Sequence, residues 1–457
     1  MTTTQGPTAL GRRDMPGPSR WSAPQLLTRM ARNRLEVMMD VSARYGDAVR
    51  LPLGPKTLHF FNHPDHARYL LAENSTNYHK GIGLIHARRT LGDGLLTSEG
   101  ELWHKQRKTI QPVFQPKRIA RQADAIADEA VKLARRLGTH IGGGPVDIRH
   151  EMTELTLGVL GRSLLDADLS AYQGIGDSFE AVQDQAMFEM MSLSSVPTWV
   201  PLPKQLRFRR ARADLQVIVD RLVAERKARG DVQTSDDVVS RLIESTALEA
   251  DPAVGRQRMR DELVTLLLAG HETTASTLSW TFYLADQHPE IWQRLHEEAV
   301  TVLGDRTPVY EDLHNLRYTA MVVDEVMRMY PPVWLLPRMA VADDEVGGFH
   351  VPAGADVVLC PYTLHRHPEF WTRPDQFDPD RFDPARAADR PRYAYIPFGA
   401  GPRFCVGNNL GMMETAFVVA AVARELRLTM VPDYRVVPEP MLTLRIRGGL
   451  PMTVHSA

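Results

Sequence analysis

The stretch that decides the fold is FGAGPRFCVGNNL, residues 398–410. It contains Cys405, one of only 2 cysteines among 457 residues, with Gly401 four positions before it and Gly407 two positions after it. A helix is expected to begin near residue 407, where free backbone N–H groups and the positive end of the helix dipole favour a negative sulfur. Glycines on both sides let the backbone curl around that sulfur. The loop is therefore a candidate site for a metal-binding cysteine thiolate.

The residues around this loop narrow the choice of metal. A structural zinc site needs further Cys or His ligands at short spacing, and the sequence has none near Cys405. Haem iron needs a single ligand from the protein, because the porphyrin supplies four nitrogens. The alternative is a buried structural cysteine at a turn, which a lone cysteine most often represents.

The spacing of Phe398, Gly399, Arg403, Cys405 and Gly407 resembles the haem-binding signature of the cytochrome P-450 family. The resemblance implies that Cys405 is the axial thiolate ligand of the haem iron. It also implies that Arg403 hydrogen bonds a haem propionate and that Phe398 packs beside the sulfur and tunes the iron. Gly399 belongs to the same haem-binding set.

A second motif, LLLAGHETTAST at residues 266–277, lies in the middle of the longest expected helix. Ala269, Thr273 and Thr277 recur every four residues and so share one face of that helix. Gly270 costs about 1 kcal/mol in a helix interior relative to alanine and needs a reason. Threonine hydroxyls that bond back to helix carbonyls can open a helix locally. The face is therefore a candidate polar notch in the core.

This stretch resembles the family's oxygen-activation motif. The resemblance implies that Thr273 hydrogen bonds the oxygen to be activated, that Glu272 is its acidic partner, and that Ala269 and Gly270 lie against the haem. The zinc-protease pattern H-E-x-x-H is not met, because Ala275 stands where the second histidine would be. The alternative interpretation is an ordinary core helix with a tolerated glycine and a solvated glutamate.

Three further motifs match the family in the expected order. In EVMR, an exposed pair of Glu325 and Arg328 would contribute less than about 0.5 kcal/mol. The resemblance implies instead that the pair is buried, and that Arg381 of FDPDRF joins it and locks the loop that presents Cys405.

Trp103 and Arg107 of ELWHKQRK, together with Arg338 of LLPRMA, match positions that contact the haem propionates. Cations around two carboxylates neutralise a buried anionic edge. Without the resemblance, Trp103 and Arg107 would be a core aromatic and a surface charge. The resemblance covers the chain from about residue 24 to its C-terminus.

Composition agrees with a large globular enzyme. The sequence is 43% hydrophobic and 24% charged, and its net charge of −2 gives no overall attraction to nucleic acid or to a membrane surface. Two cysteines fit a reducing, cytoplasmic location. No stretch approaches the roughly 20 apolar residues of a membrane span, and no apolar region follows Arg12 and Arg13 as in a twin-arginine signal.

The polar N-terminus, which contains proline and glycine, predicts a flexible tail over residues 1–23. The periodicity after it predicts one mainly α-helical domain over 24–457 with small β-sheets. By resemblance this is the cytochrome P-450 fold, with a long central helix over the haem and the cysteine loop before the last long helix. A helix is expected from residue 24 to Gly46, followed by a hairpin of AVRLPLG and TLHFFN with its turn at PK. Strands are expected over 333–360 and an irregular segment over 367–403. The other long helices are expected at 116–137, 150–166, 204–229, 257–287, 315–330 and 407–426.

The resemblance implies a haem-thiolate monooxygenase that uses haem b, O2 and electrons ultimately from NAD(P)H. It would insert one oxygen atom into a lipophilic small molecule by hydroxylation or epoxidation. The sequence looks most like bacterial natural-product tailoring members, and a terpenoid is favoured over a polyketide or a fatty-acid-like substrate. A peroxygenase or isomerase that needs no reductase electrons, and a haem sensor or carrier, stay open as alternatives. Glu272 and Thr273 favour the monooxygenase.

Methionine-rich, adaptable walls suit a lipophilic substrate, although a methionine stripe is more often ordinary core. By resemblance the pocket is lined by the loop 79–100 and by Met187, Phe188, Met190, Met191, Val333, Trp334, Leu335, Met441 and Leu442.

The chain ends shortly after the expected haem helix, so electrons are expected from a separate ferredoxin and ferredoxin reductase. The run HKQRKTIQPVFQPKRIAR contains cations and no acid. It is either a docking patch for an acidic partner or a solvated basic face. The candidate patch consists of Lys105, Lys108, Lys117, Arg118 and Arg121. The protein is expected to be a monomer without a nucleic-acid partner.

Overall fold

The computed structural model describes residues 14–457 except 55, 170–173, 192–198, 201 and 236, and only the backbone of residues 86 and 189–191. The chain divides into two compact units. The smaller unit comprises Met1–Ile82, Leu335–Pro374 and Arg390–Phe404, and the larger unit comprises Gly83–Trp334, Asp375–Asp389 and Cys405–Ala457. Among the described residues, no helix is both long enough and apolar enough to span a membrane. The single domain expected over residues 24–457 stays a prediction.

The smaller unit is built on a mixed sheet of five strands in the order β1-β2-β8-β5-β3. These strands are β1 (Ala48–Leu53), β2 (Lys56–Phe61), β8 (Asp356–Leu359), β5 (Leu336–Ala340) and β3 (Tyr78–Lys80). The expected hairpin is β1–β2, but Lys56 pairs with Leu53 inside the ladder and is not part of the turn. A second hairpin, β6 (Asp344–Val346) and β7 (Phe349–Val351), confirms the strands expected before residue 360.

The first expected helix is in fact two helices, α1 (Ala23–Arg32) and α2 (Arg34–Tyr45). Asn33 is extended, with φ −152°, and its side chain accepts a hydrogen bond from the Glu36 N–H at 3.2 Å. This N-cap explains why a new helix begins there. Packing also begins before residue 24, because Met15 is buried and the Arg50 N–H donates to the Pro16 carbonyl at 2.7 Å. The flexible tail expected over residues 1–23 stays a prediction.

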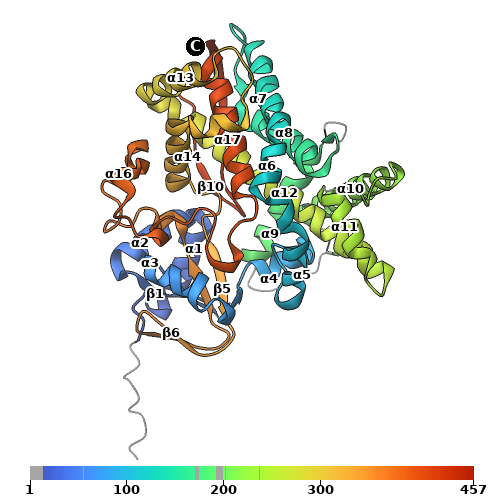
Figure 1. The fold of residues 1–457 in the computed structure, drawn as a ribbon. Helices are drawn as coiled ribbons and strands as arrows, with labels where there is room; N and C mark the ends of the chain where they lie inside the picture. The colour runs from blue at the N-terminus through green and yellow to red at the C-terminus, as the bar shows by residue number, and fades with distance from the viewer. Residues whose placement is uncertain (1–13, 55, 170–173, 192–198, 201, 236) are drawn as a thin grey trace, which may run out of the picture. The chain divides into compact units, whose positions relative to one another are not determined.

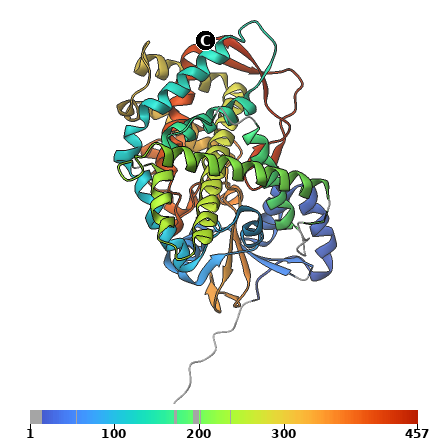
Figure 2. The same cartoon turned by 90° about the vertical axis from the view of Figure 1, so that its right-hand side faces the viewer.

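The larger unit is a helical bundle around α12 (Pro252–Gln287), which runs through its core (Figures 1 and 2). α12 packs along α8 (Ile148–Leu160), and α17 (Asn408–Glu425) packs between α7 (Ala123–Gly138) and α13 (Pro289–Leu303). α12 begins five residues earlier than expected, because Asp251 accepts from the Ala253 N–H and Pro252 occupies the first turn.

The other expected helices are confirmed with small changes. The helix expected at 116–137 is interrupted at Gln122, and the one expected at 150–166 ends in a π turn, Gly161–Leu165. Other described helices of this unit are α4 (Leu84–Leu91), α5 (Gly100–Ile110), α6 (Pro116–Arg121), α9 (Ile175–Met191), α10 (Pro203–Ala228), α11 (Val238–Ala247), α14 (Arg317–Met329) and the short α16 (Pro384–Ala387).

Two small sheets complete the larger unit. β4 (Val146–Asp147), β12 (Pro451–Ser456) and β9 (Leu426–Met430) form one of them, and β10 (Pro438–Pro440) and β11 (Leu444–Ile446) form an antiparallel hairpin. The segment expected to be irregular, 367–403, contains only short helical turns between loops. α12, α17 and the β10–β11 hairpin carry the residues discussed below.

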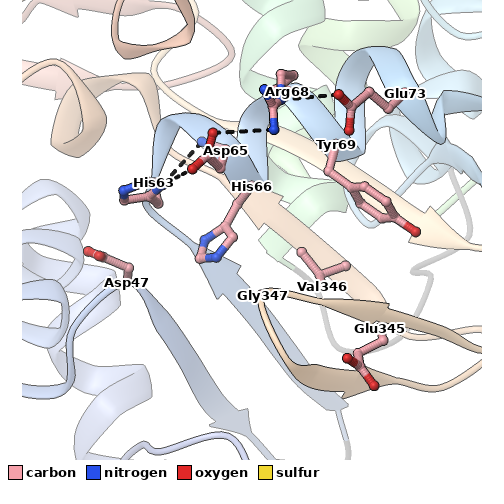
Figure 3. A pocket seen from close by; sticks show the side chains of 10 residues that line it. All are labelled: Asp47, His63, Asp65, His66, Arg68, Tyr69, Glu73, Glu345, Val346 and Gly347. Carbon is pink, nitrogen blue, oxygen red and sulfur yellow. Dashed lines mark hydrogen bonds and ion pairs between the residues drawn. The ribbon is translucent and has the colours of Figure 1, made fainter. Parts of the chain in front are cut away.

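A cleft of about 400 Å³ lies in the smaller unit, beside α3 (Pro64–Arg68) and the β6–β7 hairpin (Figure 3). Charged side chains such as Asp65 and Arg68 line it, and the His66 ring lies against Gly347. None of the site residues expected from the sequence lines this cleft.

Candidate active site

Cys405 lies three residues before α17 begins at Asn408, as expected from the sequence. Burial among protein atoms raises the pKa of its thiol, and the Gly407 N–H and the Arg107 guanidinium act in the opposite direction. A metal ion bound to the sulfur would displace the proton. The residue as a whole is nevertheless exposed to solvent.

Trp103 and Arg107 lie one turn apart on α5. Trp103 is buried, and the half-buried Arg107 donates from Nε to Gln111 Oε1 at 3.0 Å. Burial lowers the pKa of the Arg107 guanidinium, and the neighbouring Cys405 raises it. A cation held in a partly desolvated place next to Cys405 fits a group that carries carboxylates.

The loop before Cys405 belongs to the smaller unit and is held by its glycines. Gly399 (φ 70°) donates its N–H to the Ile396 carbonyl at 3.0 Å. Gly401 (φ 67°) lies so close to the Leu71 carbonyl that a Cβ would collide with it. The Phe398 and Phe404 rings lie 6.3 Å apart. These contacts fix the backbone on both sides of the half-buried Arg403.

Arg338, the other expected propionate ligand, lies on β5 in the smaller unit. It is 9% exposed, and its Nη1 donates to the Pro337 carbonyl at 2.8 Å. The adjacent strand end passes so closely that a Cβ at Gly81 would collide with the Arg338 backbone. The backbone from which the Arg338 side chain extends is therefore held in place.

The threonine face of α12 forms as the spacing predicts. Thr273 Oγ1 donates to the Ala269 carbonyl at 2.9 Å, and Thr277 Oγ1 donates to the Thr273 carbonyl at 3.0 Å. The helix nevertheless stays unbroken from Pro252 to Gln287, so the possible local opening is not observed. Gly270 has a packing reason, because a Cβ there would lie 2.6 Å from Leu160 Cδ1 on α8.

The middle of α12 also fits a large flat group. Ala269 is exposed, although Leu267 and Leu268 before it and His271 after it are buried. Because Ala269 is small and accessible in the middle of a core helix, it leaves a surface that a flat group such as a porphyrin could approach. Together with the single thiol ligand and the neighbouring Arg107, this surface makes the chain suitable for haem.

α17 connects the cysteine with the threonines of α12. A Cβ at Gly411, six residues after Cys405, would lie in ordinary contact, 3.6 Å from Thr274 Oγ1. Thr274 follows Thr273 directly in the sequence. The first turn of α17 thus packs against the part of α12 that carries the threonines.

Glu272 is directed toward the β10–β11 hairpin. Its Oε1 accepts a hydrogen bond from Thr443 Oγ1 at 3.0 Å, and its Oε2 lies 3.8 Å from His271 Nε2. His271 is buried, its Nδ1 lies 2.6 Å from the Leu267 carbonyl, and burial lowers the pKa of its imidazole. A neutral histidine and a hydroxyl therefore surround the acid. Thr443 was not expected from the sequence, because it lies 171 residues from Glu272 and no local pattern links the two.

The structure brings Glu325, Arg328 and Arg381 together in the larger unit. Arg328 Nε donates to Glu325 Oε2 at 2.6 Å, and Arg381 Nε donates to Glu325 Oε1 at 3.3 Å. Both arginines also donate to the Gln376 carbonyl, and the Asp378 N–H donates to Glu325 Oε1. Burial lowers the pKa of Arg381. The cluster thus fastens the backbone of 376–381 to α14.

The expected pocket residues are only partly assembled. Trp334 Nε1 donates to the Met441 carbonyl at 2.8 Å, which holds the segment after α14 against the hairpin. The other candidates are distributed as follows: Met187 is buried on α9, Phe188, Val333 and Leu442 are half-buried in the larger unit, and Leu335 belongs to the smaller unit. Met190 and Met191 lie in the last turn of α9, and their side chains are outside the described residues.

The expected loop 79–100 is fastened to α12 where α4 ends. The Asp93 N–H donates to Asp261 Oδ2 at 2.8 Å, and the Leu95 N–H donates to Glu262 Oε2 at 3.1 Å. Burial raises the pKa of Asp261. The sequence analysis missed these two buried acids.

The basic patch is smaller than expected from the sequence. Lys105 Nζ lies 2.5 Å from Glu249 Oε1, because α11 packs against α5. Lys108, Lys117 and Arg121 are exposed, and Arg118 is half-buried. Lys105 is therefore partly neutralised by an acid 144 residues away in the sequence.

Comparison with known proteins finds relatives over nearly the whole chain. The family model for cytochrome P450 matches residues 14–450. Cyclooctatin synthase of Streptomyces melanosporofaciens is 36% identical over 423 residues, which covers 91% of this chain and 90% of that protein. Cyclooctat-9-en-7-ol 5-monooxygenase of the same species is 35% identical and covers 88% of this chain and 86% of that protein. Pentalenene oxygenase of Streptomyces avermitilis is 32% identical and covers 91% of both chains.

Proposed function

The chain belongs to the cytochrome P450 family and is a haem-dependent monooxygenase, and we propose that it oxygenates a terpenoid with Cys405 as the iron ligand. The observation that carries the proposal is the packing of α17 on α12, in which Gly411 lies against Thr274. This packing supports a common site for the thiol and for the Glu272–Thr273 pair. Hydroxylation or epoxidation in secondary metabolism is the proposed outcome.

The following residues would hold the haem. Cys405 would bind the iron, Ala269 and Gly270 would face the ring, and Phe398 and Gly399 would support the cysteine loop. The proposed propionate contacts are Trp103, Arg107, Arg338 and Arg403. Bound haem supplies the activation of O2, and thiolate ligation favours cleavage of the O–O bond.

The protein's own part is to supply protons and exclude bulk water. Thr273 Oγ1 is a donor whose present acceptor, the Ala269 carbonyl, lies within its own helix at 2.9 Å. A rotation about χ1 turns this hydroxyl away from the helix, while Glu272 beside it holds or gives up a proton at Oε1. A peroxygenase or isomerase would not need this pair.

The substrate proposal rests on similarity and on the lining residues. Three relatives are named for terpenoid products or substrates, and this chain covers at least 86% of each. Met187, Trp334 and Leu442 offer apolar surface to such a molecule. Electrons would come from NAD(P)H through a ferredoxin and its reductase. The exposed Lys108, Lys117 and Arg121 would receive the acidic ferredoxin. A monomeric state and a cytoplasmic location stay predictions.

The first test is the carbon monoxide difference spectrum of the dithionite-reduced protein, with wild type compared with Cys405→His. We expect a strongly red-shifted Soret band in the wild type and its loss in the variant. Cys360→Ser is the matched control, because Cys360 is fully buried and lies outside the proposed site. An unshifted band in the wild type would contradict thiolate ligation.

The second test addresses the substrate class. Pentalenene, cyclooctat-9-en-7-ol, a fatty acid and a macrolide would each be titrated into the ferric protein, with the Soret shift as the measure of binding. We expect shifts from the terpenoids alone. A shift from the fatty acid or the macrolide without one from either terpenoid would contradict the proposed class.

A further inference from the structure

His66 joins α3 to the β6–β7 hairpin in the smaller unit (Figure 3). Its ring lies 5.1 Å from the ring of Phe61 on β2, with an angle of 73° between the two planes. Its Nε2 also lies so close to Gly347, in the turn between β6 and β7, that a Cβ there would collide with it. The imidazole ring is therefore packed against both a strand of the five-stranded sheet and the hairpin turn.

The surroundings of His66 favour its neutral form. Burial lowers the pKa of its imidazole below 6.5, and His63, whose ring lies 5.5 Å away, lowers it further. Asp47 and Asp65 act in the opposite direction. Asp47 Oδ1, however, already lies 2.9 Å from His367 Nε2, and Asp65 is exposed, so solvent screens its charge. The packed ring therefore binds a proton less readily than a free histidine does.

Other charged and titratable groups beside α3 are engaged with one another or exposed. Asp65 Oδ1 lies 3.5 Å from Arg68 Nη2, and Arg68 Nε lies 3.1 Å from Glu73 Oε1. Further groups on elements that pack against α3 include Tyr69, Asp344, Glu345, and Arg392 and Tyr393 of the helical turn Arg392–Ala394. Asp47 and Asp65 can thus stabilise a proton on His66 only by weakening contacts that they already make.

α3 leads directly into the π turn Tyr69–Glu73, and the cysteine loop lies against this turn. Leu71 is buried in the same hydrophobic cluster as Val346 of the hairpin. The Leu71 carbonyl lies so close to Gly401 that no Cβ fits between them. Gly401 begins the helical turn Gly401–Arg403, which precedes Cys405 in the sequence. A displacement of α3 would therefore reach the cysteine loop through Leu71.

We propose that His66 is an acid-sensitive contact between α3 and the β6–β7 turn, and that its protonation loosens α3 and, through Leu71, the turn Gly401–Arg403. Below pH 6.5 a released His66 binds a proton more readily than the packed one does. The contact is therefore held above that pH and is lost progressively as the pH falls below it. This inference goes beyond the proposed function and rests on it only for the consequence at the haem.

Hydrogen exchange of the haem-loaded protein measures the loosening directly. Exchange of the backbone amides of 65–73 and 399–404 would be followed by mass spectrometry at pH 7.5 and pH 5.5, after correction for the intrinsic effect of pH on exchange. In the wild type we expect both segments to open severalfold more often at pH 5.5. The upper limit is about tenfold, because one proton changes the equilibrium by at most that factor over the pH unit below 6.5.

Two variants test whether His66 is responsible. His66→Gln keeps much of the reach of the side chain but cannot become charged, so it should remove most of the increase at pH 5.5. His63→Asn should reduce the increase, because asparagine still accepts the Asp65 N–H that His63 Nδ1 accepts at 3.1 Å, but it no longer lowers the pKa of His66. The inference is wrong if 65–73 opens as much at pH 5.5 in His66→Gln as in the wild type, or if 399–404 does not follow 65–73.

His350→Gln is the matched control. His350 lies on β7 of the same hairpin, but its Nε2 lies 3.5 Å from Asp343 Oδ2, so a proton gained there has a carboxylate beside it. This variant should keep the full increase of the wild type. An increase lost equally in His350→Gln and His66→Gln would overturn the specific role of His66.

The titration of the His66 ring gives a second measurement, which does not require that glutamine replace the packed ring without loss. The ring C–H signal would be followed by NMR in wild-type protein labelled at histidine, and assigned by its absence in His66→Gln. We expect a midpoint below 6.5. A midpoint at or above this value would mean that the fold does not resist the proton, which contradicts the proposed contact.

The carbon monoxide spectrum distinguishes failure of this inference from failure of the proposed function. The wild type should lose more of its red-shifted band at pH 5.5 than His66→Gln does, because only the wild type loosens the cysteine loop. A wild type without that band at pH 7.5 would count against thiolate ligation and leave the exchange result standing. Equal exchange in the wild type and His66→Gln would count against this inference alone.

Discussion

Arg328 donates two hydrogen bonds to the Glu325 carboxylate, at 2.6 and 2.8 Å, and both side chains are completely buried. The same carboxylate also accepts from Arg381 and from the backbone N–H of Asp378. An exposed i,i+3 pair would do little for stability, whereas this pair fastens a loop to α14 from inside the unit. Because the pair is buried, its loss should destabilise the protein far more than the loss of an exposed pair.

Glu325→Gln should therefore lower the free energy of unfolding by about 3–5 kcal/mol, because it leaves buried arginines without a counter-charge. Urea denaturation monitored by tryptophan fluorescence measures this loss, and haem release at low urea should increase in parallel. Glu225→Gln is the matched control, since its pair with Arg221 at 2.7 Å is exposed, and it should cost less than about 1 kcal/mol. Equal losses in the two variants would contradict the assigned structural role.

Two glycines of the proposed haem site should respond differently to alanine. At Gly401, φ is 67° and the added Cβ would meet a backbone carbonyl, that of Leu71. We expect Gly401→Ala to cost about 3 kcal/mol or more, because strain and overpacking add together. At Gly270 the obstacle is the end of the Leu160 side chain, which can move, and alanine gains about 1 kcal/mol of helix propensity.

Gly270→Ala should therefore change the unfolding free energy by no more than about 1 kcal/mol. Thermal unfolding of the two variants under identical conditions makes the comparison, and the carbon monoxide spectrum reports whether the cysteine loop keeps its geometry. A Gly401→Ala protein as stable as Gly270→Ala would show that the loop can relax around the carbonyl.

The parts of the proposed site that are contiguous in the sequence could be located from spacing alone. The cysteine loop and the threonine face of α12 each lie within about a dozen residues, so spacing alone places their members together. Thr443 and Glu272 are 171 residues apart, and Lys105 and Glu249 are 144 apart. No local pattern encodes such pairs, which arise when a hairpin or a helix packs against another element. The break at Asn33 is different, because asparagine is a strong N-cap and the signal was present.

Glu414 on α17 predicts a pH dependence of stability. It is buried, its Oε1 has no hydrogen-bond partner among the described residues, and burial raises the pKa of its carboxyl well above the usual value. The folded protein therefore keeps a proton that the unfolded chain loses above pH 4.5. Keeping this proton costs no stability below that pH. As the pH rises above it, the free energy of unfolding falls by up to about 1.4 kcal/mol per pH unit.

Glu414→Gln removes this dependence while preserving the shape of the side chain. Relative to wild type, the variant should gain stability steadily from pH 5 to pH 8, as measured by urea denaturation at each pH. Glu425→Gln, at the exposed end of the same helix, should give a difference that stays nearly constant. A constant difference for Glu414→Gln as well would mean that its carboxyl ionises in the folded protein.

The remaining prediction concerns the basic patch of α5 and α6. Lys108 and Lys117 are exposed, whereas Lys105 is paired with Glu249 at 2.5 Å. Lys108→Glu or Lys117→Glu should reduce the second-order rate of haem reduction by a reduced ferredoxin about tenfold at low salt, and the difference should shrink as salt screens the charges. Lys105→Gln should have a smaller effect than Lys108→Gln, because Glu249 already offsets its charge. Stopped-flow absorbance at several ionic strengths measures each rate. Equal losses for Lys105→Gln and Lys108→Gln would mean that Glu249 does not offset the charge of Lys105. A loss that persists at high salt would mean that the ferredoxin does not bind through this patch.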